Sequence, residues 1–448
     1  MRKYVFLFVC LYFIPALALA DAASTKYYKN WPQWRGPDAN GVSVYGKAPV
    51  KWDENKNIKW KIEIPGKGHA TPLVWGNQIF VLTAIETDKK KEPEKEVPAQ
   101  GQNQGLGTNI STHNKIKFVI LAVNRSDGSI IWQHTAREEV PHEGMQSTGS
   151  WASNSPVTDG KHIFAYFGSH GLYCYDMQGK LIWDKDFGDM TIKNAWGEGS
   201  SPALYKDKIV VTWDHEGQSF IIALDKNTGK ELWKTDRDEG TSWATPLIVK
   251  SNGKPQVVTN ATSKIRSYDL ATGKLLWEST GMTQNVIPTP VAAKGMVYVM
   301  SGFMGNALQA IRLSEAKGNI AGSKAIVWKL DKDTPYIPSP LLYDDMLYFT
   351  SGMGGNHLSC VNAGTGEAYY SNQRLKGLGS LIYASPVLAD GKIYITSRNG
   401  STLVIKDGPQ FEVLATNKLD DCFSASPVIV DSELYLRGDK YLYCITEK

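Results

Sequence analysis

Three tryptophans lie close before Ser-Pro or Thr-Pro pairs and have side chains that could stack on a ligand. Trp151, Trp196 and Trp243 precede such a pair by four, five and two residues in three successive repeats of the sequence. The flat ring of a redox cofactor, or an aromatic side chain of a partner, could pack against them. The alternative is that they only cover the edges between neighbouring repeats.

The densest polar cluster of the chain is Asp214-His215-Glu216. It offers oxygen and imidazole donors, but it lacks the fixed spacing of a zinc site such as His-Glu-x-x-His, and a solvated loop is the alternative. Asn260 and Arg398 complete the candidate ligand-binding residues. The residues assign no catalytic group and no metal ligand.

Eight Ser-Pro or Thr-Pro pairs position these side chains. Their serines and threonines are Thr71, Ser155, Ser201, Thr245, Thr289, Ser339, Ser385 and Ser426. After a first interval of 84 residues the spacings are 46, 44, 44, 50, 46 and 41, the period of a four-stranded propeller blade. The pattern predicts an all-β fold, an eight-bladed β-propeller of four-stranded antiparallel blades.

A large apolar residue, aromatic in most copies, recurs near the end of each repeat, where it can fill the space between blades. The expected docking residues are Trp132, Trp183, Trp233, Trp277, Trp328, Tyr370 and Leu414. The last repeat has room for only three strands, whereas residues 57–64 form an orphan strand before the first pair. We expect this strand to pair with the last blade and close the ring, with Trp60 as the eighth docking residue.

The chain divides into three parts. Residues 1–20 are expected to be a signal peptide, residues 21–56 an irregular N-terminal extension, and residues 57–448 the propeller. The aromatic stretch from Trp31 to Pro37 is expected to pack against the outside of the propeller. The charged and glycine-containing residues 88–115 predict a mobile insertion in the first blade.

The first 20 residues carry Arg2 and Lys3, then an apolar run, then Ala18-Leu19-Ala20. This order predicts a secretory signal cleaved after Ala20, and hence a periplasmic or secreted protein without another transmembrane segment. An uncleaved anchor is the alternative. Of 49 basic residues, 47 remain after cleavage against 45 acidic ones, which gives no reason to invoke nucleic acid or an anionic membrane. A closed ring needs no partner surface, so we expect a monomer.

Three of the cysteines share one position of the repeat. Cys174, Cys360 and Cys444 align with alanines of other blades, which predicts a small buried side chain at that place. These three lie in separate blades, and only Cys422 with Cys444 is a candidate disulfide. We expect the exported protein to contain mostly or wholly free thiols.

The runs at residues 223–233 and 267–277 resemble the tryptophan-docking motif of pyrroloquinoline quinone (PQQ) alcohol dehydrogenases. The motif is also found in the assembly factor BamB and in many exported PQQ-like propeller proteins. The resemblance implies the eight-bladed fold and a functional face built by two sets of loops. The first set offers His142, Glu143, Trp151, Trp196, Glu198, Trp243, Asn285, Tyr336 and Tyr383. The second offers His170, Asp214, His215, Glu216, Asn260, Arg266, Asn306, Asn356, His357, Arg398 and Asn399.

The resemblance implies two functions. One is an exported BamB-like propeller that binds a protein, peptide or polymer on its loop face without chemistry of its own. The other is a PQQ- and calcium-dependent oxidoreductase acting on an alcohol or sugar. Glu216 and Asn260 follow the second strand of their blades, where calcium ligands could project, but the adjacent cysteines of many such enzymes and a Cys-x-x-Cys-His haem site are missing. The sequence favours the binding protein.

Overall fold

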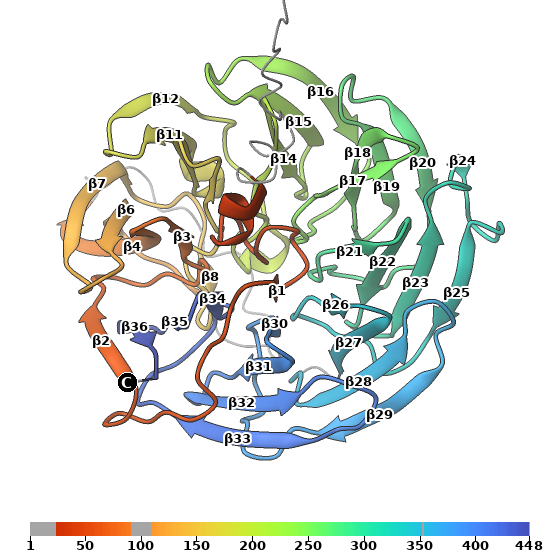
Figure 1. Ribbon diagram of the computed structural model, residues 1–448. Coiled ribbons are helices and arrows are strands. Elements are labelled where there is room, and N and C mark those ends of the chain that lie inside the picture. The colour runs from red at the N-terminus through yellow and green to blue at the C-terminus, as the bar shows by residue number, and fades with distance from the viewer. Residues whose placement is uncertain (1–23, 91–108, 352–353, 448) are drawn as a thin grey trace, which may run out of the picture.

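The computed structural model describes residues 24–90, 109–351 and 354–447. Antiparallel strands form eight blades around a central axis (Figure 1), as the spacing of the Ser-Pro and Thr-Pro pairs predicts. The expected signal peptide and residues 91–108 of the expected insertion lie outside the described residues. Two short 3₁₀ turns, η1 (Gly168–His170) and η2 (Lys193–Ala195), and a helical turn at residues 24–28 complete the described elements.

Each blade runs from an innermost strand at the axis to an outermost strand at the rim. Blade 1 contains β3 (Leu73–Trp75), β4 (Gln78–Lys90), β6 (Asn114–Asn124) and β7 (Ile130–Glu139). Blade 2 contains β9 (Val157–Thr158), β10 (His162–Tyr166), β11 (Leu172–Asp176) and β12 (Leu181–Lys185). Blade 3 contains β13 (Ala203–Tyr205), β14 (Lys208–Trp213), β15 (Ser219–Asp225) and β16 (Glu231–Arg237). Blade 4 contains β17 (Leu247–Ser251), β18 (Lys254–Thr259), β19 (Ile265–Asp269) and β20 (Leu275–Ser279), with β24 (Gly318–Asn319) added at its edge.

The second half of the ring repeats this order. Blade 5 contains β21 (Val291–Ala293), β22 (Met296–Ser301), β23 (Ala307–Arg312) and β25 (Ile326–Leu330). Blade 6 contains β26 (Leu341–Tyr343), β27 (Met346–Ser351), β28 (His357–Asn362) and β29 (Ala368–Arg374). Blade 7 contains β30 (Val387–Ala389), β31 (Lys392–Thr396), β32 (Ser401–Lys406) and β33 (Val413–Lys418), with β1 (Val42–Ser43) beside β30. Blade 8 contains β34 (Val428–Val430), β35 (Glu433–Arg437), β36 (Tyr441–Ile445) and β2 (Ile58–Glu63).

The serine or threonine of each pair belongs to a closed ring of hydrogen bonds around the axis. In every blade the backbone N–H of this residue donates to the side-chain oxygen of its counterpart in the next blade, at 2.9–3.2 Å. The last bond runs from Ser426 back to Thr71. A small hydroxyl side chain is therefore required at each position, which explains the repeated residue type.

Pairing of β2 with β36 closes the propeller as predicted. Trp60 lies opposite Cys444 in this ladder, the same register in which Trp132 faces Ala122 and Trp183 faces Cys174. The small residue of each pair leaves room for the large one. Trp60 therefore occupies the docking position of blade 8.

The docking tryptophans pack on a turn glycine of the next blade. A Cβ added to Gly229 would lie 2.7 Å from the ring of Trp183, and its φ of +68° also favours glycine. The ring nitrogens donate to a carbonyl oxygen of the same turn at 2.9–3.3 Å, from Trp60, Trp132, Trp183, Trp233 and Trp328 to Arg125, Met177, Lys226, Leu270 and Ala363 respectively. Each of these residues joins two blades through burial and a hydrogen bond.

Two docking positions depart from the expectation. Trp277 donates to Gln256 of its own blade, because the longer turn of blade 5 places β24 beside β20. In blade 7 the residue opposite Val404 is Ala415, and Leu414 occupies the bulge before it. The expected docking role of Leu414 is therefore wrong by one residue.

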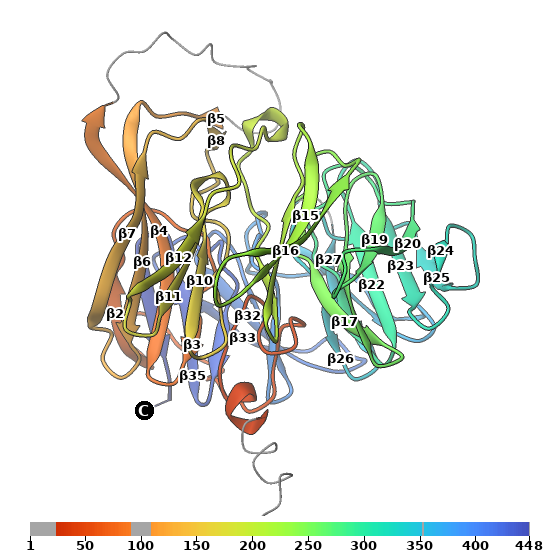
Figure 2. The same ribbon diagram turned by 90° about the horizontal axis from the view of Figure 1, so that it is seen from above.

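The N-terminal extension crosses one end of the channel rather than packing against the outer rim. Trp31 is fully buried and forms a β-bridge with Val74 of the innermost strand β3. Farther along, β1 pairs in parallel with β30, the innermost strand of blade 7. Figure 2 shows the red extension at one end of the propeller and the short strands β5 (Asn109–Ile110) and β8 (Met145–Gln146) at the other.

The flanks of the expected insertion are strands. Residues 88–90 continue β4, and residues 109–110 pair with β8 near the end of the molecule opposite the extension. The described cysteines Cys174, Cys360, Cys422 and Cys444 are all free. No helix within the described ranges is long and apolar enough to cross a membrane.

Candidate functional site

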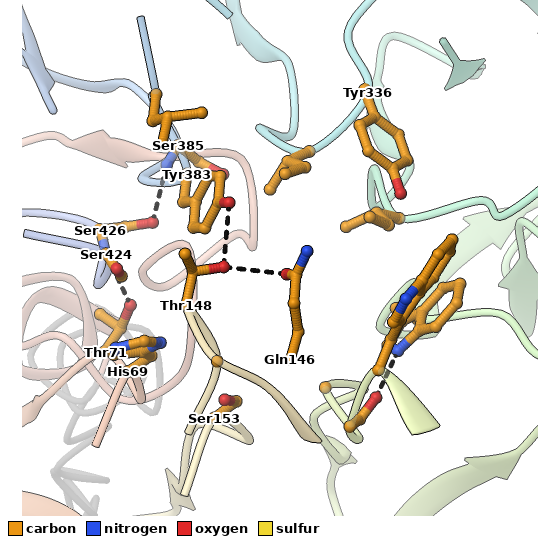
Figure 3. A pocket seen from close by; sticks show the side chains of 18 of the residues that line it. His69, Thr71, Gln146, Thr148, Ser153, Tyr336, Tyr383, Ser385, Ser424 and Ser426 are labelled. Atoms are coloured by element: carbon orange, nitrogen blue, oxygen red, sulfur yellow. Dashed lines mark hydrogen bonds between the residues drawn. The ribbon is translucent and has the colours of Figure 1, made fainter. Parts of the chain in front are cut away.

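A cavity of about 620 Å³ lies among the central loops of the propeller (Figure 3). We call it the loop-face cavity. Its lining includes Gln146 of β8, the strand at the end opposite the N-terminal helical turn (Figure 2). Its walls come from the loops that join an outermost strand to the next innermost strand, and from loops between the second and third strands of a blade. These are the two loop sets that the family resemblance implies.

One wall is a continuous row of aromatic rings. The rings of Trp243 and Trp196 lie 6.3 Å apart, and Trp196 lies 6.2 Å from Phe303 in an edge-to-face arrangement. Phe303 continues the row to Tyr336 at 4.9 Å. The ring nitrogen of Trp243 donates to the carbonyl oxygen of Gly197 at 2.7 Å, which fixes the orientation of its indole. A flat or apolar group of a ligand could pack against this aromatic wall.

The opposite side is polar. The hydroxyl groups of Thr148 and Tyr383 lie 3.2 Å apart, and Thr148 donates to the side-chain oxygen of Gln146 at 2.9 Å (Figure 3). Behind them the guanidinium of Arg398 lies 5.0 Å from the centre of the Tyr383 ring and donates to Ser424. The cation fixes this ring on one side and leaves its phenol facing the cavity.

The inner end of the cavity reaches the hydroxyl ring. Five of its eight residues line the cavity: Thr71, Ser155, Ser201, Ser385 and Ser426. Trp34 of the extension also lines it, so residues from the two opposite ends of the propeller meet in one space. The extension thereby contributes a side chain to the inner part of the cavity.

The lining residues of the cavity include the carboxyl group of Glu198 and the imidazole of His69. Burial raises the pKa of Glu198, although His170 and the two hydrogen bonds from Ser169, at 2.8 and 2.6 Å, favour its charged form. Burial also lowers the pKa of His69, despite the Asp439 carboxylate 3.2 Å from its Nε2. Both shifts favour the neutral form of the group, so the cavity is less charged than its residue types suggest.

Of the residues offered by the two loop sets, those that line the loop-face cavity are Trp196, Glu198, Trp243, Tyr336, Asn356 and Tyr383. Trp151 instead lines a separate small cavity of about 20 Å³, with room for about one water molecule. Glu198 lies between the two cavities and lines both. Among the described residues, no partner accepts a hydrogen bond from the ring nitrogen of Trp151.

The cluster of Asp214, His215 and Glu216 is engaged in contacts within the fold. Asp214 accepts two hydrogen bonds from the buried Arg237, at 2.7 and 2.9 Å. His215 accepts from the backbone N–H of Thr191 at 3.0 Å. Glu216 accepts a hydrogen bond from the hydroxyl of Thr241 at 2.7 Å. These side chains hold neighbouring loops together and do not line the loop-face cavity.

Asn260 also has a position between blades. Its amide donates to the carbonyl oxygens of Pro288 and Met300 at 3.0 and 2.8 Å, which joins blades 4 and 5. Arg398 supports the cavity wall from behind through its contacts with Tyr383 and Ser424. Sequence reasoning did not select several polar residues that line the cavity: His69, Gln146, Thr148, Ser153, Ser380 and Ser424.

The donor set of the cavity does not fit PQQ with calcium. Calcium takes six to eight oxygen ligands, mainly from carboxylates. Among the described lining residues Glu198 is the single carboxylate, which is too few for a calcium site of this kind. Elsewhere in the described chain no group of three or more His, Cys, Asp or Glu residues is arranged to hold a metal ion.

Two curated relatives match this chain. BamB of Francisella salina is 28% identical over 100 residues, which cover 22% of this chain and 18% of that protein. Tetrathionate hydrolase of Acidithiobacillus ferrooxidans is 25% identical over 350 residues, which cover 64% of this chain and 65% of that protein. This chain therefore spans less than two thirds of the length of either relative.

Solved structures share the fold. BamB from Moraxella catarrhalis aligns with a TM-score of 0.54 and 15% identity, over 82% of this chain and all of that chain. Quinohemoprotein alcohol dehydrogenase from Comamonas testosteroni aligns with a TM-score of 0.61 and 10% identity, over 96% of this chain and 82% of that chain. At these identities the likeness shows the propeller alone.

The family model described as outer membrane protein assembly factor BamB matches residues 117–280 and 217–448, about three quarters of the chain. The matched range begins in the third strand of blade 1 and runs to the C-terminus. This chain is therefore a member of the BamB family and is built as an eight-bladed PQQ-like β-propeller.

Proposed function

We propose that this protein binds a partner protein, and that an aromatic side chain of the partner enters the loop-face cavity. The observation that carries the proposal is the row of Trp243, Trp196, Phe303 and Tyr336 along one wall. Aromatic side chains in such contact gain about 0.5–1.5 kcal/mol beyond the area that they bury. An aromatic residue of a partner would extend the row.

The size and polarity of the cavity support a peptide segment as the ligand. Its volume of about 620 Å³ is within the range of sites that enclose a small ligand. Thr148, Gln146 and Tyr383 supply hydroxyl and amide groups opposite the aromatic wall, where they can bond to a peptide backbone. The cavity can therefore take the side chain and backbone of a short segment.

Membership of the BamB family suggests where this binding would take place and with which class of partner. The family model and one of the two curated relatives are named for the assembly of outer membrane proteins, and the expected signal in residues 1–20 would export this chain. Under this proposal the protein is exported, and its partners are other exported proteins. The quinone function has no support from the donor set of the cavity.

Calorimetric titration with two blocked tripeptides tests the proposal. Acetyl-Ala-Trp-Ala-amide should bind to the protein, whereas acetyl-Ala-Leu-Ala-amide should bind at least about tenfold more weakly, because it lacks the aromatic contact. The double variant Trp196→Ala, Trp243→Ala should lose the difference. Tyr369→Ala, which removes an exposed aromatic residue from the rim strand β29, should retain it. Equal affinity of the wild-type protein for the two peptides would refute the proposal.

A further inference from the structure

We infer that the inner end of the loop-face cavity binds an oxyanion, so that the ligand carries a carboxylate or sulfonate group toward the channel axis. The inference rests on the proposed function for the aromatic part of the ligand and adds the chemistry of its other end. Two independent features support it: the hydroxyl ring and the buried Arg35.

The hydroxyl ring presents unused hydrogen-bond donors. Each of its eight side-chain oxygens accepts the backbone N–H of the preceding blade. A hydroxyl group can also donate one hydrogen bond, and within the described chain none of the eight donates to another residue. The five that line the cavity are at most 5% exposed. Their protons are thus available to acceptors placed on the axis.

Arg35 provides a buried positive charge beside this ring. It is 1% exposed and donates to the carbonyl oxygens of Pro386 and Asn40 at 2.8 and 3.0 Å, and also to that of Pro340. Pro340 and Pro386 directly follow two residues of the hydroxyl ring. Arg35 does not itself line the cavity, but it follows the lining residue Trp34 and binds the carbonyl oxygen of Pro386, which follows the lining residue Ser385.

The charge of Arg35 is not compensated. Among the described residues no carboxylate lies within 4.0 Å of the guanidinium. Its hydrogen-bond acceptors are neutral carbonyl groups of the backbone. Burial lowers the pKa of Arg35 to about 9, which still leaves it charged at neutral pH. An unpaired buried charge is costly, and an anion nearby would offset that cost.

The two features suit one chemical group. An oxyanion has several acceptor oxygens for a circle of hydroxyl donors, and its charge is attracted by Arg35 through a medium of low polarity. Glu198, the carboxylate among the described lining residues, is directed to Ser169 and has a raised pKa, so it opposes an anion only weakly. The C-terminus of a peptide and a free aromatic acid both offer this chemistry.

The test compares N-acetyl-L-tryptophan with N-acetyl-L-tryptophanamide by calorimetry at neutral pH. The two ligands share the indole ring and differ in the charge of one end. The carboxylate should bind at least about tenfold more tightly, a difference of the size expected for one nearby charge in a partly shielded site. Sodium sulfate should weaken binding of the carboxylate and leave binding of the amide unchanged.

Matched variants assign the effect to Arg35. Arg35→Gln should bind both ligands equally, whereas Arg35→Lys should retain the preference for the carboxylate, with thermal melting as a check of folding. If Arg35→Gln does not fold, the comparison of the two ligands with the wild-type protein is decisive.

Equal affinity of the wild-type protein for the two ligands overturns the oxyanion site but does not contradict binding in the aromatic part of the cavity. Absence of binding by both ligands overturns the proposed function as well. A peptide that ends in tryptophan with a free carboxylate, compared with the free amino acid derivative, distinguishes the two sources of the anion.

Discussion

The backbone N–H of Ser426 donates to Oγ1 of Thr71 at 3.2 Å, although the two residues lie 355 positions apart in the chain. This bond closes the hydroxyl ring at the junction of blades 8 and 1. Both residues also line the loop-face cavity. The feature that holds the eight blades in register therefore also forms the inner end of the candidate binding site.

Removal of one ring hydroxyl should destabilise the fold. Ser426→Ala takes away the acceptor of the Ser385 N–H, a buried bond of 3.0 Å, and should lower the free energy of unfolding by about 1–3 kcal/mol. Ser426→Thr retains the oxygen and should be close to wild type. Urea unfolding measures both variants. Equal midpoints for the alanine and threonine variants would show that the ring does not stabilise the propeller.

Trp60 should be as important for stability as a residue of the central core. Its ring packs on Gly128, and its nitrogen donates to the carbonyl oxygen of Arg125 at 3.0 Å. Trp60→Ala should therefore cost about 3–5 kcal/mol of unfolding free energy. Trp60→Phe keeps much of the packing and should cost less. A loss below about 1 kcal/mol for the alanine variant, measured by urea unfolding, would argue against closure through β2.

The sequence predicted the propeller because its blades repeat. The Ser-Pro and Thr-Pro pairs, the turn glycines and the docking aromatics recur at one spacing, so each copy supports the interpretation of the others. The extension has no such repetition. Nothing in the stretch around Trp34 and Arg35 indicates that it would cross the channel, because the guanidinium of Arg35 is held by carbonyl oxygens about 300 to 350 positions away in blades 6 and 7.

The site was predicted only in part for a similar reason. Trp196 and Trp243 recur at comparable places before a Ser-Pro or Thr-Pro pair, and both line the cavity. The density of charge at Asp214 to Glu216 does not say where these side chains point, and the structure shows Asp214 paired with Arg237 at the end of β16 in the same blade. Such a pairing depends on side-chain direction, which the sequence pattern does not carry.

The carboxyl group of Glu143 should make stability depend on pH. Burial raises its pKa, and Glu198 adds to the shift, although the backbone N–H of Ile192 donates to it at 2.9 Å. A raised pKa in the folded state means that this group contributes stability at low pH and loses it as the pH rises from about 4.3, the value for an unfolded glutamate.

Glu143→Gln removes that titration and keeps an acceptor for Ile192. Relative to wild type, the variant should gain stability steadily as the pH rises above about 4.3 through the folded pKa of Glu143. Urea unfolding at several pH values between 4 and 8 measures this difference. A constant difference over the whole range would contradict the assignment.

Calcium should not promote binding of PQQ. The cavity has one described carboxylate, Glu198, and its two oxygens already accept hydrogen bonds from Ser169. Titration of the protein with PQQ should therefore give the same affinity with calcium as with a chelator. Binding that becomes at least about tenfold tighter with calcium, together with alcohol-dependent reduction of a dye, would establish the quinone function instead.

The most direct test of the proposed function is a crystal structure of the protein with acetyl-Ala-Trp-Ala-amide. The proposed function requires the indole of the peptide to lie within the loop-face cavity, in contact with Trp196 and Trp243, with the peptide backbone near Thr148 and Tyr383. An ordered peptide on the outer rim, with the loop-face cavity filled by water, would contradict it.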